Sequence, residues 1–266
     1  MYDFSYHRAA SVADASSKLK AAEDGKLVAG GMTLIPTLKA RLAQPSHLID
    51  IAGISDLHGI VLKDGRLSVG AATKHHEIAT SKEVRQAIPA LAYLAGLIGD
   101  PQVRNLGTMG GSIANNDPAA DYPAAVLALG ANVITTRREI AADHYFQGVF
   151  ATALEPGEII SSIVFPVPER AAYAKFPHPA SGYAMTGVFV AQTANGVRVA
   201  VTGAGPGVFR WKEAETALAK SMNAAAIDDL VVDAEPLNED FHAPREYRAN
   251  LMKVMTKRAV AAIAGK

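Results

Sequence analysis

The chain has 266 residues, enough for one large domain or two modest ones with a substantial core. Its 26 basic and 26 acidic residues cancel, so neither nucleic acid nor an anionic membrane is an expected partner. Cysteine is absent, which excludes disulfides, thiolate nucleophiles and iron–sulfur ligation by the chain itself. The N-terminus lacks a signal-peptide pattern and no window approaches about eighteen continuous apolar residues, so we expect a cytoplasmic protein without stable membrane insertion.

The first predicted element is a helix that begins with the capping box Ser11-Val-Ala-Asp14 and ends at Gly25. A strand at 26–29, a helix from about 33 to 43 and a strand at 47–51 follow. This β-α-β order predicts a parallel sheet. Ligands usually bind at the carboxyl ends of the strands in such sheets.

A hairpin is predicted over 60–69, because Asp64-Gly65 supplies a two-residue turn between alternating segments. Residues 74–99 have a helical pattern that is interrupted at Pro89. The elements expected next are a helix at 119–129 and strands at 131–136 and 159–165. We expect the first domain to end near Pro166-Val-Pro168.

The strongest short hairpin signal in the chain is Asn195-Gly196, which lies between apolar segments at 183–193 and 197–203. Helices are expected to pack on this antiparallel sheet at about 211–221, 223–231 and 245–264. A mixed sheet followed by an antiparallel sheet with helices predicts an α+β fold.

Two glycine-centred stretches, 27–36 and 106–123, carry the functional signal. In the first, an apolar strand stops at Gly30-Gly31 and a helical pattern follows at once, an order that brings backbone N–H groups to an anion. The second stretch has a similar glycine pair and adds polar groups suited to ribose hydroxyls, namely Asn115, Asn116, Asp117 and Asp121. Neither stretch has the usual dinucleotide or Walker pattern, and a single glycine pair is more often an ordinary turn.

Taken together, these stretches resemble the FAD-binding medium subunits of the molybdenum hydroxylases. That family includes the medium subunits of carbon monoxide dehydrogenase and of quinoline and nicotine oxidoreductases, and the flavin domain of xanthine dehydrogenase. The resemblance runs from Tyr2 to the C-terminal helix. Its motifs are Ala29-Gly-Gly-Met-Thr-Leu-Ile-Pro36, Val103-Arg-Asn-Leu-Gly-Thr-Met-Gly-Gly-Ser112, Asp117-Pro-Ala-Ala-Asp-Tyr-Pro123, Leu154-Glu-Pro-Gly-Glu-Ile-Ile160 and His178-Pro-Ala-Ser-Gly-Tyr-Ala-Met185.

The resemblance implies an FAD-binding region of the vanillyl-alcohol-oxidase type over residues 1–168, with subdomains at about 1–57 and 58–168. A smaller C-terminal domain of antiparallel sheet plus helices would cover 169–266. The flavin itself carries the chemistry in such proteins, so no catalytic side chain is expected. The residues that the resemblance assigns to FAD are Ala29, Gly30, Gly31, Met32, Thr33, Thr108, Gly110, Gly111, Ser112, Asp121, Ile160, His178 and Tyr183.

Within this set, the two glycine loops would wrap the pyrophosphate, with Met32 acting through its backbone N–H. Asp121 would contact the sugar or ribityl portion. Tyr183 would lie beside one face of the isoalloxazine, where it can gate the electron acceptor. His178 would polarise the pyrimidine end of the flavin or hold a nicotinamide acceptor.

The residues themselves leave several alternatives open. Thr33 and Asp121 are equally suited to capping the helices that follow them. Ile160 is either a backbone contact to the adenine or ring system or simply part of a core strand. Lys175 is a second candidate beside His178 for the pyrimidine end or a nicotinamide acceptor, but we expect it at the solvated surface. His75-His76 does not predict a metal site, because adjacent side chains point in different directions and no ordered set of further ligands accompanies them.

The resemblance implies an electron-transfer subunit. Electrons would come from two [2Fe–2S] clusters on a small subunit, the molybdenum cofactor would lie on a large subunit, and the assembly would be a dimer of heterotrimers. The absence of cysteine fits this division, because the clusters need thiolates from another chain. The alternatives are a stand-alone FAD-dependent oxidoreductase of the same fold superfamily and a non-catalytic assembly module that has lost FAD.

Overall fold

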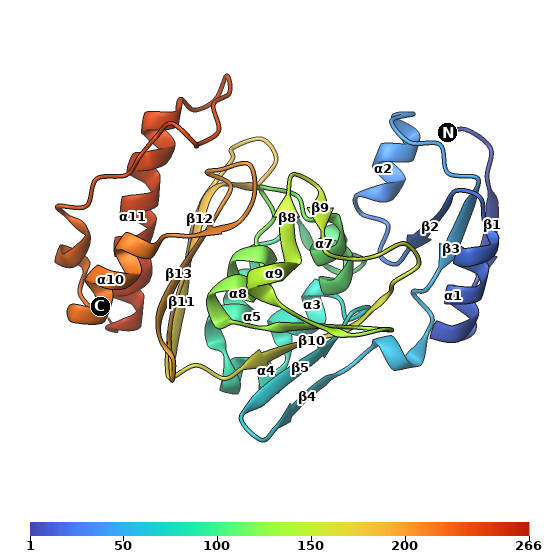
Figure 1. Cartoon of the computed structure of the whole chain (residues 1–266), viewed down its shortest axis with the longest axis horizontal. Coiled ribbons are helices and arrows are strands. Elements are labelled where there is room, and N and C mark those ends of the chain that lie inside the picture. Colours follow the sequence, from blue (N-terminus) through green and yellow to red (C-terminus); the bar gives the residue numbers. More distant parts are fainter. Residues whose placement is uncertain (266) are drawn as a thin grey trace.

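The computed structural model describes residues 1–265, which form three successive regions along the long axis of the molecule (Figure 1). A first lobe with a parallel sheet lies at the N-terminal end. A central region follows, with a five-stranded antiparallel sheet covered by helices. A third region carries a four-stranded antiparallel sheet, with the C-terminal helices on its outer face. The predicted α+β organisation is confirmed.

The first lobe has three parallel strands in the order β1-β3-β2, so the predicted parallel sheet is confirmed. Its elements are β1 (Ser5–Arg8), α1 (Val12–Ala21), β2 (Gly25–Val28), α2 (Leu34–Lys39), β3 (His47–Asp50) and η1 (Ser55–Leu57). The Ser11 side chain accepts a hydrogen bond from the Asp14 N–H, which caps α1 as predicted. The sequence did not predict β1, because this four-residue strand is mostly exposed and polar.

The central sheet has the strand order β4-β5-β10-β6-β7. Its strands are β4 (Ile60–Lys63), β5 (Arg66–Gly70), β6 (Asn132–Thr135), β7 (Glu139–Ala141) and β10 (Ile160–Pro166), and the small hairpin β8 (Phe146–Gly148) and β9 (Ala151–Thr152) lies beside it. Asp64 and Gly65 both have positive φ, as the predicted two-residue turn requires.

The helices of the central region are α3 (His75–Thr80), α4 (Lys82–Ala87), α5 (Pro89–Gly96), α6 (Pro101–Arg104), α7 (Met109–Asn115), α8 (Tyr122–Leu129) and α9 (Ala142–Tyr145). The helix expected over 74–99 is three short helices, because Ser81 caps a new helix by accepting from the Val84 N–H and Pro89 begins another. Every residue of α8 is buried, so this helix forms the centre of the core.

The third region contains β11 (Arg170–Pro177), β12 (Ala184–Thr193), β13 (Gly196–Thr202), β14 (Phe209–Arg210), α10 (Lys212–Lys220), η2 (Ala224–Ile227) and α11 (Arg245–Ile263). One face of its sheet shares the core of α8, while α10 and α11 cover the other face. The helix predicted at 223–231 was wrong beyond Ile227, because the polar pair Asp228-Asp229 and the β-branched pair Val231-Val232 do not continue a helix. No helix within residues 1–265 is both long enough and apolar enough to cross a membrane.

Candidate functional site

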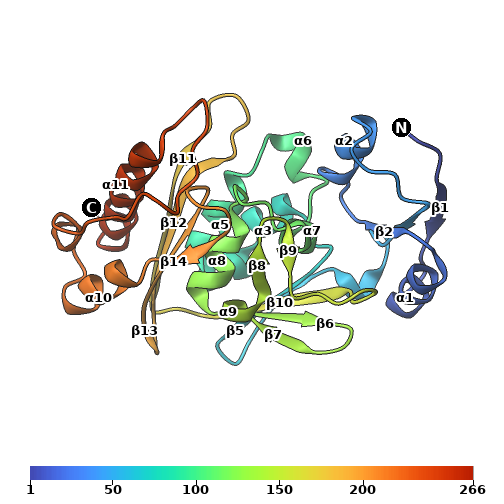
Figure 2. The same ribbon diagram turned by 45° about the horizontal axis from the view of Figure 1, so that its top comes forward.

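The two glycine loops touch each other. Gly30 follows β2, and the segment Leu106-Gly107 leads into α7, which lies on the side of the central region that faces the first lobe (Figure 1, Figure 2). A Cβ at Gly30 would lie 2.1 Å from the Leu106 carbonyl oxygen and 2.7 Å from the Gly107 Cα. Only glycine allows this approach, because both obstructing atoms belong to the backbone.

The loops differ in what their N–H groups do. In the second loop the Gly110 N–H donates to the Ala71 carbonyl at 2.8 Å, and the Gly111 N–H donates to the Thr108 hydroxyl at 3.1 Å. Within residues 1–265, the first loop is the opposite case: the N–H groups of residues 30–33 have no acceptor in the protein. Four neighbouring unpaired donors are a site that an anion can satisfy.

A cavity of about 940 Å³ opens at these loops, between the first lobe, the central region and the turn that joins β11 to β12. Apart from His178, every residue assigned to FAD lines it, which brings together Ala29, Gly30, Gly31, Met32, Thr33, Thr108, Gly110, Gly111, Ser112, Asp121, Ile160 and Tyr183. A second cavity of about 530 Å³ between β8 and the C-terminal helices contains none of them. We therefore place the candidate site in the larger cavity.

The hydroxyl groups in the cavity are held differently. Thr33 lies at the start of α2 but its side chain does not cap the helix, so the capping alternative for Thr33 was wrong. Thr108 does cap α7, by accepting from the Gly111 N–H. A hydroxyl that accepts one hydrogen bond still has its own proton to donate. The Thr108 hydroxyl can therefore cap α7 and donate a hydrogen bond to an anion at the same time.

Asp121 is buried in the cavity wall and is held by β11. Its carboxylate accepts from the Tyr173 hydroxyl at 2.5 Å and from the Lys175 ammonium at 3.0 Å. Burial raises the pKa of Asp121, while the adjacent Lys175 charge opposes this rise. The N-cap alternative was wrong, because the Asp121 side chain does not cap α8.

Lys175 was expected at the surface and this was wrong. Its side chain is only 4 % exposed, and besides pairing with Asp121 it donates to the Leu97 carbonyl at 3.3 Å. A lysine is buried in this way only when it is paired. The pair joins the third region of the molecule to the wall of the cavity.

The turn from Ala180 to Tyr183 reaches the cavity from the end of β11. Tyr183 is 44 % exposed there, and burial, followed by the carboxylates of Asp117 and Asp121, raises its pKa. His178 does not line the cavity. Its Nδ1 accepts from the N–H groups of Ala180 and Ser181 at 3.2 and 3.3 Å, so it shapes the turn that carries Tyr183.

Some lining residues were not among the predicted ones. His75 is buried beside Gly107, where burial and, secondarily, the charge of Arg104 lower its pKa to about 4, so it is neutral. Glu158 and Phe150 also line the cavity. Among residues 1–265 no group of three or more histidine, aspartate or glutamate side chains is placed to hold a metal ion. An adjacent histidine pair in a sequence gives no sign that one member faces a cavity.

This arrangement fits a dinucleotide. The cavity lies within the usual range of about 300–1,000 Å³ for small-molecule sites. Unpaired N–H donors suit a pyrophosphate, and polar side chains around Asp121 suit a ribityl chain. The aromatic ring of Tyr183 provides a flat surface in the same cavity. These donors match the FAD that the resemblance implies.

Comparisons with known proteins agree with this assignment. The family model for the FAD binding domain in molybdopterin dehydrogenase matches residues 2–168, and that for the CO dehydrogenase flavoprotein C-terminal domain matches residues 171–263. The chain is 36% identical to the carbon monoxide dehydrogenase medium chain of Afipia carboxidovorans, over 97% of this chain and 95% of that one. It is 33% identical to the glyceraldehyde dehydrogenase medium chain of Sulfolobus acidocaldarius, over 98% and 99%.

Solved structures give the same answer. A chain of carbon monoxide dehydrogenase from Hydrogenophaga pseudoflava superposes with a TM-score of 0.91 at 35% identity, covering 99% of this chain and 98% of that one. A chain of quinoline 2-oxidoreductase from Pseudomonas putida has a TM-score of 0.90 at 28% identity, with coverage of 99% and 98%.

Proposed function

Because this chain belongs to the FAD-binding medium subunits of the molybdenum hydroxylases, we propose that it transfers electrons from [2Fe–2S] clusters on a small partner subunit to an external acceptor. The molybdenum cofactor would lie on a large partner subunit. The observation that carries the proposal is the first glycine loop, whose four unpaired N–H groups line a cavity of dinucleotide size.

Different residues of the cavity would bind different parts of FAD. The N–H groups of Gly30, Gly31, Met32 and Thr33 would hold the pyrophosphate, with further donors from the hydroxyls of Thr108 and Ser112 in the same cavity. When bound, FAD would supply the redox chemistry. The Tyr183 ring would cover one face of the flat ring system and restrict access from solvent.

Asp121 would receive the ribityl hydroxyls while it remains fixed by Tyr173 and Lys175. Since its two oxygens already accept from β11, the carboxylate is held in one orientation before the cofactor arrives. A rigid acceptor of this kind binds more tightly than a mobile one, because less side-chain freedom is lost on binding.

Composition and family both support the proposed partner subunits. The chain has no cysteine and therefore cannot hold the clusters that supply its electrons. Relatives named medium chain or medium subunit belong to assemblies of several chains. We propose a dimer of heterotrimers, with residues 1–168 as the FAD-binding domain, divided at about residue 57, and 169–266 as the C-terminal domain.

The test is to express the tagged chain together with the open reading frames beside its gene and to weigh the purified assembly by native mass spectrometry. We expect FAD on this chain, iron on a small cysteine-rich partner and molybdenum on a large one. A chain that purifies alone with FAD and oxidises a small molecule directly would instead establish a stand-alone oxidoreductase. An intact assembly that lacks flavin would instead support the alternative that the chain is a non-catalytic assembly module.

A further inference from the structure

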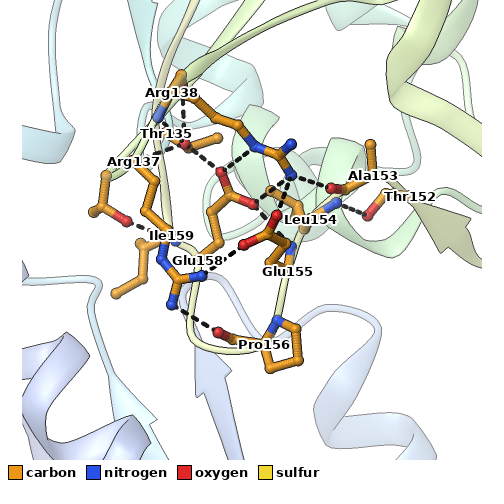
Figure 3. Close-up of polar contacts among 11 residues, drawn as sticks. Thr135, Arg137, Arg138, Thr152, Ala153, Leu154, Glu155, Pro156, Glu158 and Ile159 are labelled. Atoms are coloured by element: carbon orange, nitrogen blue, oxygen red, sulfur yellow. Dashed lines mark hydrogen bonds and ion pairs between the residues drawn. The ribbon is translucent and has the colours of Figure 1, made fainter.

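Glu158 is a carboxylate inside the cavity wall whose hydrogen-bonding capacity is filled (Figure 3). Its side chain has no exposed surface. It accepts from the Thr135 hydroxyl at 2.6 Å, from the Glu155 N–H at 2.8 Å, and from Nε and Nη2 of Arg138 at 3.1 Å each. The Arg138 guanidinium thus binds the carboxylate with two parallel hydrogen bonds, a strong and directional geometry.

The same guanidinium also contacts the segment that follows β9. Arg138 Nη2 donates to the Ala153 carbonyl at 2.7 Å, so one side chain fixes the β6–β7 turn, the segment after β9 and the segment that leads into β10. The Thr136 N–H donates to the Ile159 carbonyl at 2.9 Å, and the Ile159 N–H donates to the Thr136 hydroxyl at 3.2 Å. The backbone next to Glu158 has no freedom to shift alone.

This segment connects two parts of the molecule across the cavity. Ile159 packs in the hydrophobic core of the first lobe, with Ile49, Ile51 and Leu57. Its neighbour Ile160 packs instead in the core of the central region. Both isoleucines and Glu158 line the cavity. The position of this segment therefore sets how far the first lobe, which carries the first glycine loop, stands from the central region.

We propose that Glu158 and Arg138 are positioning residues for FAD binding: their ion pair fixes the 154–160 segment between the two lobes and keeps the cavity wall electrically neutral. This inference rests on the proposed function. It assigns to the Leu-x-Pro-Gly-Glu motif a role beyond forming a turn before a strand.

The two members of the pair are not equivalent. Without Arg138, the Glu158 carboxylate stays buried and loses its counter-charge, in the wall of a cavity that receives an anionic pyrophosphate. The Arg138 side chain is 42 % exposed, so its charge stays solvated when the Glu158 charge is removed. Removing the cation should therefore harm FAD binding more than removing the anion, whereas a purely structural pair would suffer about equally from either change.

The difference should also depend on pH. The Arg138 hydrogen bonds, the Glu155 N–H and Thr135 outweigh burial and lower the pKa of Glu158 to about 2, so it is charged at any working pH. The other titratable groups that face it are Glu155 on its own turn and Tyr145 on α9. With Arg138 replaced, the Glu155 N–H and the Thr135 hydroxyl still oppose burial but the hydrogen bonds and charge of Arg138 are lost, so the pKa of Glu158 rises and the unpaired charge grows as the pH increases.

The experiment measures FAD affinity of the full chain by fluorescence titration between about pH 5.5 and about pH 8.5 for Arg138→Met, Glu158→Gln and the double variant. We expect Arg138→Met to bind FAD at least about tenfold more weakly at the highest pH, with affinity improving as the pH falls. Glu158→Gln and the double variant lose anchoring contacts but leave no unpaired buried charge, so both should show a smaller loss of about two- to fivefold that does not depend on pH. Arg137→Met, which removes hydrogen bonds to Glu155 and Pro156 of the same segment but none to Glu158, separates anchoring from the buried charge; its FAD affinity should not depend on pH and should fall by no more than that of the double variant.

Arg138→Lys serves if the methionine variant does not fold, because it keeps the charge. It loses the paired hydrogen bonds to Glu158, so it should bind FAD about two- to fivefold more weakly than wild type, but without pH dependence because the cation remains. Wild-type affinity in the double variant would overturn the anchoring role, and equal losses in Arg138→Met and Glu158→Gln at all pH values would overturn the charge argument. Either result would leave the proposed function standing. A wild-type chain that takes up no FAD, alone or assembled with its partners, would overturn the proposed function itself.

Discussion

Replacement of Gly30 by alanine tests the contact between the two glycine loops. The new Cβ would lie 2.1 Å from the Leu106 carbonyl oxygen, and Cβ atoms do not come closer than 3.0 Å, so the loops must separate by at least 0.9 Å. A shift of that size breaks hydrogen bonds between the first loop and a phosphate. Losing two such bonds, each worth about 1.5–3 kcal/mol with a charged partner, weakens FAD binding on the order of 100-fold or more.

The assay is FAD titration of the apoprotein, with circular dichroism to show that the variant folds. Gly65→Ala is the matched control: Gly65 has a φ of 70° and nothing within 4 Å of its added Cβ, and it lies in the β4–β5 turn away from the cavity. It should lose about 1–2 kcal/mol of stability and keep its FAD affinity. Wild-type affinity in a folded Gly30→Ala variant would refute the argument that the loops hold the pyrophosphate.

Three further predictions concern stability. Lys175→Met leaves the Asp121 carboxylate buried without its cation and should cost about 3–5 kcal/mol in urea unfolding at neutral pH, with partial recovery in Lys175→Met/Asp121→Asn; unchanged stability would contradict the pairing. Because His75 is neutral when folded, with a pKa of about 4 instead of 6.5, stability should fall by about 3 kcal/mol as the pH drops from 6.5 to 4; His75→Asn should lack that loss. Glu158, with its pKa lowered to about 2, contributes stability above the ordinary glutamate pKa of 4.5 that is lost as the pH falls toward 2; Glu158→Gln should show a shallower acid transition by up to about 3 kcal/mol, and an identical transition would contradict its ion pair.

The glycine loops could be predicted from the sequence because their signals are local. A strand, a glycine pair and a helix start lie within ten residues, so chain order alone shows where N–H groups converge. The motifs of the family then linked Ala29 to Tyr183, which the fold brings to one cavity. The α+β order could also be derived from local signals, because hairpin turns such as Asp64-Gly65 lie within a few residues of the strands that they join.

The sequence did not predict features that depend on distant partners. Lys175 looks like a surface residue until β11 lies against Asp121, which is 54 residues earlier in the chain. The strand itself was missed because Ala171-Ala172 and Ala174 have low strand propensity, and burial on both faces of the sheet compensates. The pairing of Arg138 with Glu158, 20 residues later, likewise exists only once β6, β7 and β10 are assembled.

The most direct test of the central claim is the visible absorption spectrum of the purified chain, assembled with its partner subunits, followed by chromatographic identification of the released cofactor. The structure predicts oxidised-flavin absorption and about one FAD for each copy of this chain, held in the cavity at Gly30 and Thr108. Colourless protein in the intact assembly, with both glycine loops unaltered, would contradict it.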